Sequence, residues 1–290
     1  MNRVTANGIE IVYDSFGSPS GRPLLLIMGL GSQMIHWDEE FCELLAEHGH
    51  HVVRFDNRDV GLSTHLHEAG VPDLGAASGG AQAVPYLLGD MADDAAGLLD
   101  TLGLPSAHVL GVSMGGMIAQ TFAIRHPART RSLTSIMSTP GPQIGAPTEQ
   151  AMAALLSRST PDREAVVRRA LEVWKVLGSP GFPMDEERIT RLAGQSFDRS
   201  YDPAGFGRQF AAILASGDRT AALRELSVPA LVIHGEADPL VRLPGGVATA
   251  DAIPGAKLIT FPGMAHDLPR PLWPEIAAAV TDLTERADRP

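Results

Sequence analysis

A glycine–serine–glycine turn between an apolar run and a helical pattern constrains this chain more than any other feature. The run Val109–Val112 has the composition of a buried strand and stops at Ser113. Helical spacing begins at once, with apolar residues three or four positions apart at Met114, Met117, Ile118 and Phe122. Gly111 and Gly115 allow strand and helix to approach closely, because a Cβ at either position would clash with the turn. The turn therefore predicts a strained serine whose hydroxyl is exposed at a helix N-terminus.

Strand-like and helix-like segments alternate along most of the chain. Apolar runs suited to strands occur at Leu24–Met28, His51–Phe55, Ser132–Met137, Ala230–His234 and Lys257–Phe261. Helical patterns occur at Trp37–His48, Met91–Leu102 and Leu272–Leu283, and Asn7-Gly8 predicts a hairpin. An irregular stretch rich in Gly and Ala covers His65–Val84. Alternation with strands that are apolar on both faces predicts an α/β fold with a mostly parallel, doubly covered β-sheet.

One long segment breaks this alternation. Between Thr139 and Val228 there is no convincing strand, and the best helical pattern places Val166, Ala170 and Trp174 on one face. We interpret residues 140–227 as a helical cap inserted into a core that is formed by residues 1–139 and 228–290.

Composition excludes several classes of partner. The chain has 290 residues and a net charge of −11, which disfavours nucleic acid and anionic membrane surfaces. No apolar run approaches the ~18 residues that a bilayer-spanning helix needs, and the N-terminal residues do not resemble a secretion signal. We therefore expect a soluble, cytoplasmic protein. The sequence leaves its oligomeric state open.

Two further residues complete a catalytic triad with Ser113. A serine hydroxyl is a poor nucleophile without a base, and the base needs a carboxylate to orient it. Asp238 follows the predicted strand that ends at His234, and His266 follows the strand that ends at Phe261. The carboxyl ends of parallel strands meet at one edge of a sheet, where such sheets bind ligands. Glu236 is the rival for the acid, although its place so close to the strand end favours a loop role.

The tetrahedral oxyanion of an acyl transfer needs two N–H donors. The turn directs the N–H of Met114 at the group that Ser113 attacks. The N–H of Leu30, in the loop Gly29-Leu30-Gly31, is the predicted second donor, and the alternative interpretation of that loop is a tight turn.

The remaining histidines suggest no metal site. His48, His50 and His51 lack the spacing of metal ligands, and we interpret them as a solvated helix end. We interpret His234 as hydrogen-bonded scaffold. The predicted chemistry needs no metal and no cofactor.

The chain resembles the α/β-hydrolase fold family, and within it the esterases of the aclacinomycin methylesterase type, which act on polyketide esters. The matching stretches are Leu26–Gly31, Val53–Ser63, Gly111–Gly115, Val232–Pro239 and Gly263–His266. The resemblance implies the same triad and the same two oxyanion donors. It departs at Met28, where many relatives carry histidine, so the side-chain support of that loop must differ. The family's structural loop falls on residues 56–63, which implies an internal ion pair between Arg58 and Asp59.

We expect a serine esterase that cleaves a carboxylic ester or lactone of a bulky apolar molecule, such as a polyketide or macrolide antibiotic. Candidate residues for the substrate pocket are His36, Trp37, Trp174, Phe182, Phe206 and Phe210. Each aromatic residue taken singly is more often core than ligand contact. The alternatives are a carbon–carbon bond hydrolase of ring-cleavage products, a perhydrolase or haloperoxidase-like enzyme, and a ligand-binding receptor without turnover.

Overall fold

The computed structural model describes residues 1–77 and 84–289, so part of the predicted irregular stretch, residues 78–83, lies outside the described residues. Eight strands form one sheet in the order β1-β2-β4-β3-β5-β6-β7-β8. Their bounds are β1 Asn2–Ala6, β2 Ile9–Phe16, β3 Arg22–Ile27, β4 His50–Phe55, β5 Ala107–Val112, β6 Thr130–Ile136, β7 Ala230–Gly235 and β8 Lys257–Phe261. β2 pairs antiparallel with β1 and β4, and β4, β3, β5, β6, β7 and β8 run parallel. The predicted α/β class with a mostly parallel sheet is confirmed.

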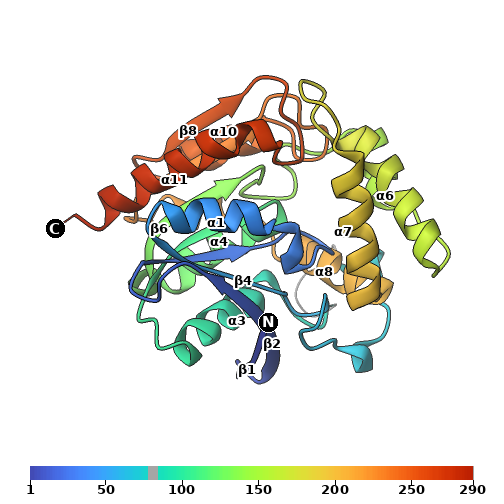
Figure 1. The fold of residues 1–290 in the computed structure, drawn as a ribbon, viewed down its shortest axis with the longest axis horizontal. Coiled ribbons are helices and arrows are strands. Elements are labelled where there is room, and N and C mark those ends of the chain that lie inside the picture. Colours follow the sequence, from blue (N-terminus) through green and yellow to red (C-terminus); the bar gives the residue numbers. More distant parts are fainter. Residues whose placement is uncertain (78–83, 290) are drawn as a thin grey trace.

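Helices cover both faces of the sheet (Figure 1). One face packs against α1 (Glu39–Glu47) and α11 (Trp273–Ala287) in an apolar core that includes Leu26, Leu110 and Ile233. The other face packs against α3 (Leu88–Thr101), α4 (Met114–Arg125) and α10 (Pro244–Ala252). Covering both faces explains why the central strands are continuously apolar rather than alternating.

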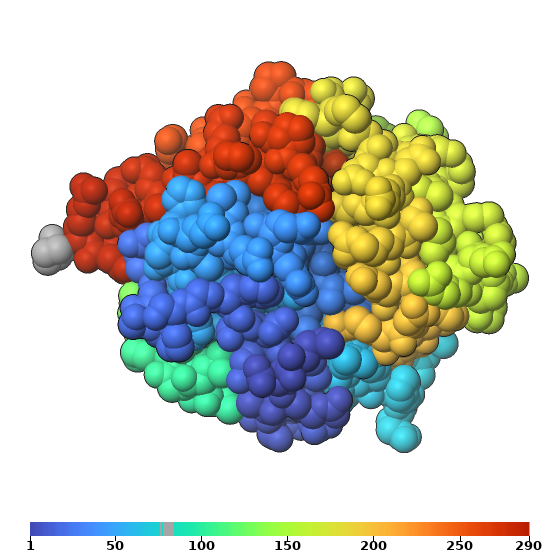
Figure 2. All heavy atoms as spheres, in the orientation of Figure 1, coloured from blue at the N-terminus to red at the C-terminus, as the bar shows by residue number. Residues whose placement is uncertain are grey.

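Between β6 and β7 the chain forms helices only. These are α5 (Glu149–Leu155), α6 (Arg163–Leu177), α7 (Glu186–Arg199), α8 (Pro203–Ala215) and α9 (Thr220–Leu223). In Figure 2 the atoms of this segment, yellow to green, gather at one end of the molecule. The short helix α2 (Leu74–Ala77) precedes residues 78–83.

No helix in residues 1–77 and 84–289 combines the length and the apolar composition that crossing a bilayer requires.

The structure corrects the interpretation of Arg58 and Asp59 as a pair with each other. Arg58 Nε lies 2.6 Å from Asp94 Oδ2 on α3, and Asp59 Oδ1 lies 2.8 Å from Arg208 Nη2 on α8. Both pairs are buried, so the loop after β4 is fixed to a sheet-covering helix on one side and to an inserted helix on the other.

The interpretation of His50 as part of a solvated helix end is also wrong. His50 begins β4 and is fully buried, with Nδ1 bonded to Leu45 O and Nε2 to Thr284 Oγ1, each at 2.8 Å. The ring joins the two helices that cover this face, and burial lowers the pKa of His50.

Candidate active site

Ser113 occupies the sharp turn between β5 and α4. Its backbone angles, φ 55° and ψ −123°, lie in a region that a residue with a side chain adopts only at a cost. A Cβ placed on Gly111 would lie 2.0 Å from Gly115 O, so only glycine permits this close crossing of strand and helix. The Ser113 N–H donates to Ile136 O of β6 at 2.9 Å, which fixes the strained turn to the sheet.

His266 lies between Ser113 and Asp238. Its Nε2 is 2.9 Å from Ser113 Oγ, and its Nδ1 is 2.7 Å from Asp238 Oδ2. His266 is 8% exposed and Asp238 3% exposed, so both side chains are shielded from water, whereas Ser113 is half-buried. The structure thus brings together three side chains that follow three different strands.

The Asp238 carboxylate is held by the backbone of its own loop. Its Oδ1 accepts the N–H groups of Leu240 at 2.8 Å and Val241 at 2.9 Å, which leaves Oδ2 for the histidine. A carboxylate held in this way can fix the ring orientation of His266.

Glu236, the rival for the acid, and His234, which we interpret as scaffold, form other hydrogen bonds. Glu236 is exposed and accepts a hydrogen bond from Thr260 Oγ1 at 2.8 Å. His234 Nε2 donates to Val241 O at 2.7 Å, and burial lowers the pKa of His234 and so favours its neutral form.

The loop after β3 lies directly beside the nucleophile. A Cβ built on Gly29 would lie 3.2 Å from Ser113 Cβ, so glycine is what lets the backbone approach. In the described part of the chain no acceptor takes the Leu30 N–H. The first N–H of α4, on Met114, likewise has no partner within its helix. These two donors are available to an oxygen atom near Ser113.

Two side chains from the loop after β4 support the predicted oxyanion loop, residues 28–34. Asn57 Nδ2 donates to Met28 O at 3.0 Å. Asp56 Oδ1 accepts the Met34 N–H at 2.7 Å. The amide of Asn57 and the carboxylate of Asp56 therefore bind the backbone at the two ends of this loop.

A third support comes from the inserted helices and was missed in the sequence. Gln209, on α8, is fully buried and accepts the Gly31 N–H at 2.8 Å, while its Nε2 donates to Arg58 O at 2.7 Å. Nothing in the local pattern around Gln209 indicates this role, because its partners lie more than 150 residues earlier in the chain.

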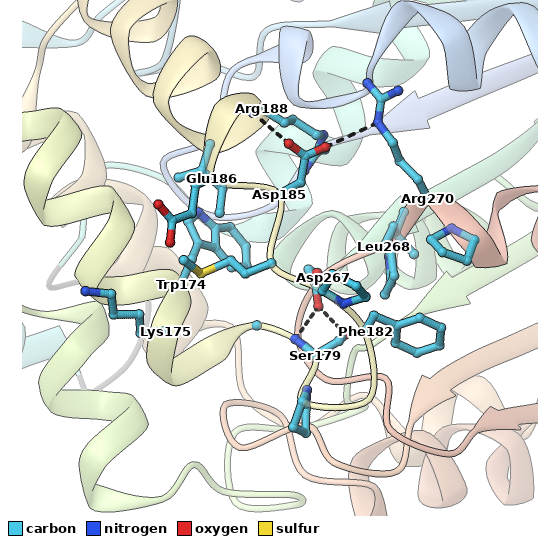
Figure 3. A pocket seen from close by; sticks show the side chains of 17 residues that line it. Trp174, Lys175, Ser179, Phe182, Asp185, Glu186, Arg188, Asp267, Leu268 and Arg270 are labelled. Carbon is cyan, nitrogen blue, oxygen red and sulfur yellow. Dashed lines mark hydrogen bonds and ion pairs between the residues drawn. The ribbon is translucent and has the colours of Figure 1, made fainter.

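Two of the predicted pocket residues, Trp174 and Phe182, line the same cavity of about 740 Å³ between α6, α7 and the segment after His266 (Figure 3). Apolar and charged groups share its wall, among them Met184, Leu268, Asp185, Arg188 and Arg270. Asp267, the residue after His266, also lines it, whereas Ser113 and His266 do not. The cavity therefore adjoins the histidine loop without opening onto the nucleophile.

The other predicted pocket residues lie elsewhere. Phe206 packs over Gly31 of the oxyanion loop, and its ring centroid lies 6.4 Å from that of Phe210. Trp37 is 1% exposed and stacks on Phe41, so its ring belongs to the core. His36 bonds to a backbone oxygen, and burial lowers its pKa to about 4.

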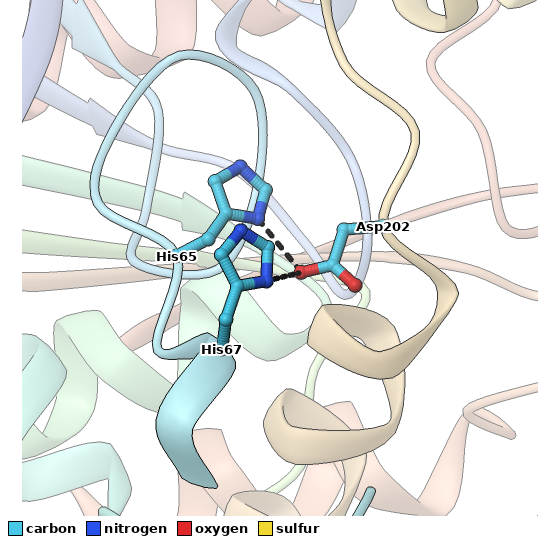
Figure 4. Close-up of side chains that lie close together, drawn as sticks. All are labelled: His65, His67 and Asp202. Carbon is cyan, nitrogen blue, oxygen red and sulfur yellow. Dashed lines mark hydrogen bonds and ion pairs between the residues drawn. The ribbon is translucent and has the colours of Figure 1, made fainter. Parts of the chain in front are cut away.

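Among the described residues, His65, His67 and Asp202 form a group with the ligand types of a transition-metal site (Figure 4). His65 Nδ1 lies 2.8 Å and His67 Nδ1 3.7 Å from Asp202 Oδ2. The same oxygen accepts a hydrogen bond from the Arg208 guanidinium at 2.9 Å. Because the Asp202 oxygen that both histidines approach already binds this cation, we assign no metal to this group.

Comparison with known proteins places this geometry in a family. The profile of the alpha/beta hydrolase fold matches residues 22–269. The rhodomycin D methylesterase DauP of Streptomyces sp. (strain C5) is 28% identical, with 98% of each chain covered. A 2-hydroxymuconate semialdehyde hydrolase of Pseudomonas sp. (strain CF600) is 32% identical over 68% of each chain. The enol-lactonase structure from Burkholderia xenovorans LB400 superposes with a TM-score of 0.73 at 24% identity over 99% of each chain, which supports the fold alone.

Proposed function

The chain belongs to the α/β-hydrolase fold family, and we propose that it is a carboxylic ester hydrolase with Ser113 as nucleophile, His266 as base and Asp238 as acid. The observation that carries the proposal is the continuous hydrogen-bonded series from Ser113 Oγ through His266 to Asp238 Oδ2. A structural serine would not need a buried imidazole on its hydroxyl or a strained backbone that exposes it. Full-length similarity to a methylesterase supports the same reaction class.

In the acylation half-reaction, Ser113 Oγ attacks the ester carbonyl carbon and its proton passes to His266 Nε2. The carbonyl oxygen becomes an oxyanion that accepts the N–H groups of Leu30 and Met114. Collapse of this intermediate breaks the bond to the alcohol oxygen, and His266 returns the proton to the departing alkoxide. Asp238 stabilises the imidazolium that exists between the two proton transfers.

Deacylation repeats these steps with water as the nucleophile. His266 takes a proton from the water, hydroxide adds to the acyl carbon, and the same N–H donors bind the second oxyanion. Expulsion of Ser113 Oγ, which takes the proton back from His266 Nε2, releases the carboxylic acid and restores the free enzyme.

We further propose that residues 140–227 act as a cap that selects a bulky, largely apolar substrate, with polyketide esters or lactones as the class. This segment supplies Phe206, on α8, beside the oxyanion loop, and Trp174, on α6, and Phe182, in the connection from α6 to α7, beside the histidine loop. The relative named for rhodomycin D is a methylesterase, which makes methyl esters the first substrates to examine.

The test compares the natural chain with Ser113→Ala. Hydrolysis of p-nitrophenyl butyrate should fall by at least about 10⁴-fold, since loss of a serine nucleophile in such triads removes up to ~10⁶-fold in kcat. A fluorophosphonate probe should label the natural chain and leave the variant unlabelled. Labelling of the variant, or stoichiometric ligand binding by a natural chain without turnover, would contradict the proposal.

Carbon–carbon bond hydrolysis is the second candidate, favoured by the similarity to the 2-hydroxymuconate semialdehyde hydrolase. A substrate panel separates the two reactions. If methyl esters and lactones are inert while a ring-cleavage product is consumed in a Ser113-dependent reaction, the second candidate replaces the first.

A further inference from the structure

Three consecutive residues centred on His266 are bound by one short segment of the inserted helical region. The His266 N–H donates to Leu177 O at 3.0 Å, at the end of α6. The Ala265 N–H donates to Ser179 Oγ at 2.8 Å. On the other side of the histidine, Asp267 Oδ1 accepts the Ser179 N–H at 2.9 Å.

The Ser179 hydroxyl is the centre of this arrangement. It accepts from Ala265 and donates to the Asp267 carboxylate, so both hydrogen-bonding roles of one oxygen are used on the two neighbours of the histidine. Figure 3 shows Ser179 and Asp267 facing each other at the border of the cavity. Ser179 is 9% exposed, which shields these bonds from competition with water.

The glycines on either side continue the contact. The Gly181 N–H donates to Gly263 O at 2.9 Å, and a Cβ on Gly181 would lie 2.7 Å from Gly263 Cα. Two backbones can pass this closely only where both lack side chains. The histidine loop and the segment 177–181 are therefore packed as one unit.

This support matters because of where the loop starts. It follows β8, the last strand of the sheet, whose one strand pairing among the described residues is with β7. The loop is also bound by the inserted segment 177–181. The two hydrogen bonds of the His266 ring, at 2.7 and 2.9 Å, keep their geometry only if the backbone of the histidine loop is fixed.

We propose that Ser179 and Asp267 form a positioning pair that fixes His266 from the inserted region, so that this region takes part in catalysis as well as in substrate selection. The inference rests on the proposed function of His266. Neither residue is expected to touch the substrate's reacting atoms.

The experiment compares Ser179→Ala with Ser179→Thr and with the matched control Ser216→Ala. The Ser216 hydroxyl also accepts a backbone N–H, from Leu88, and donates to a backbone oxygen, of Ala212, at a distance from the histidine loop.

We expect Ser179→Ala to lower kcat by about 10- to 100-fold, as for a small misplacement of a reacting group, with KM changed less than about twofold. The acid limb of the kcat/KM–pH profile should move to lower pH, since a loosened histidine is less well held against Asp238. Ser179→Thr, which keeps the hydroxyl, should restore most of kcat.

The control separates positioning from general stability. Ser216→Ala should lower the melting temperature by a similar amount and leave kcat and the pH profile unchanged. If Ser179→Ala gives the same result as Ser216→Ala, the proposal is wrong.

Should Ser179→Ala fail to fold, Asp267→Asn tests the same pair, because it keeps the shape of the side chain and removes the charge beside Ala265 and His266. An unchanged pH profile in this variant also overturns the proposal. Failure of the proposed function is recognised separately, because the natural chain itself would then neither hydrolyse esters nor react with fluorophosphonate.

Discussion

At the scale of single residues, the site depends on places where a side chain is absent. Gly111 and Gly115 let β5 and α4 cross, and Gly29 lets the oxyanion loop approach Ser113. A Cβ on Gly29 would lie 3.2 Å from Ser113 Cβ, which is tight enough to force one of them to move by a few tenths of an ångström.

We therefore expect Gly29→Ala to lower kcat for p-nitrophenyl butyrate by about tenfold or more, because the rate is sensitive to sub-ångström displacement of the nucleophile. The unfolding midpoint should change little, since the φ of Gly29 is not in the left-handed region and the neighbouring contact can relax. Gly89→Ala is a suitable control, as its φ is also outside the left-handed region, a Cβ there would meet its nearest atom, on Arg125, at an ordinary 3.5 Å, and it lies in the first turn of α3. Unchanged kcat in Gly29→Ala would mean that the loop does not contact the nucleophile.

Whether the sequence alone predicts a contact depends on how far apart in the chain the contacting residues lie. The Ser113 turn is local, since its strand, glycines and helix are all within a few residues, and the pattern identifies it directly. The partners of Arg58 and Asp59 lie 36 and 149 residues away, so adjacency in sequence suggested the wrong pair. Likewise, Ser179 and Asp267 are 88 residues apart and belong to no recognisable motif.

At the level of strands and helices, the parallel topology of the sheet brings the three loops of the proposed site together. Asp238 follows β7 and His266 follows β8, and both loops leave the same edge of the sheet as the Ser113 turn after β5. Chain order and strand direction alone therefore predict that these loops meet. The placement of the inserted helices is not predictable in this way. Their amphipathic patterns predict which face of each helix is buried, but they do not predict which element covers that face. Gln209 on α8 is the clearest instance.

Replacing Gln209 by Met tests the link between α8 and the oxyanion loop. The substitution keeps the volume and leaves the Gly31 N–H and the Arg58 carbonyl without their buried partner. An unsatisfied buried polar group costs about 1–3 kcal/mol, so we expect the free energy of unfolding in urea to fall by about 2–4 kcal/mol. Gln195→Met, on α7 where the side chain is exposed, should be nearly neutral. Equal effects of the two substitutions would argue against a specific link.

At the scale of the whole molecule, the sheet and its covering helices hold several histidines away from water. His50 and His234 are fully buried and His108 is 1% exposed. Burial disfavours the charged imidazolium, so the pKa of each is lowered, and that of His108 falls to about 4. In the unfolded chain all three return to the ~6.5 of a free imidazole.

This difference makes stability depend on pH in a defined direction. Well above pH 6.5 these histidines are neutral in both states and contribute no pH dependence. As the pH falls below that value, the unfolded chain binds protons that the folded chain excludes, and the free energy of unfolding decreases until the folded-state pKa is reached. For His108 the loss should be about 1 kcal/mol between pH 7 and 5.5, with His50 and His234 adding to it. Urea unfolding at the two pH values measures the total. His108→Gln removes one titrating ring and leaves its neighbour Asp288, whose Oδ1 lies 3.4 Å from His108 Nε2, in place. If His108→Gln loses as much free energy of unfolding between pH 7 and pH 5.5 as the natural chain does, the buried ring of His108 does not contribute to the acid sensitivity of the fold.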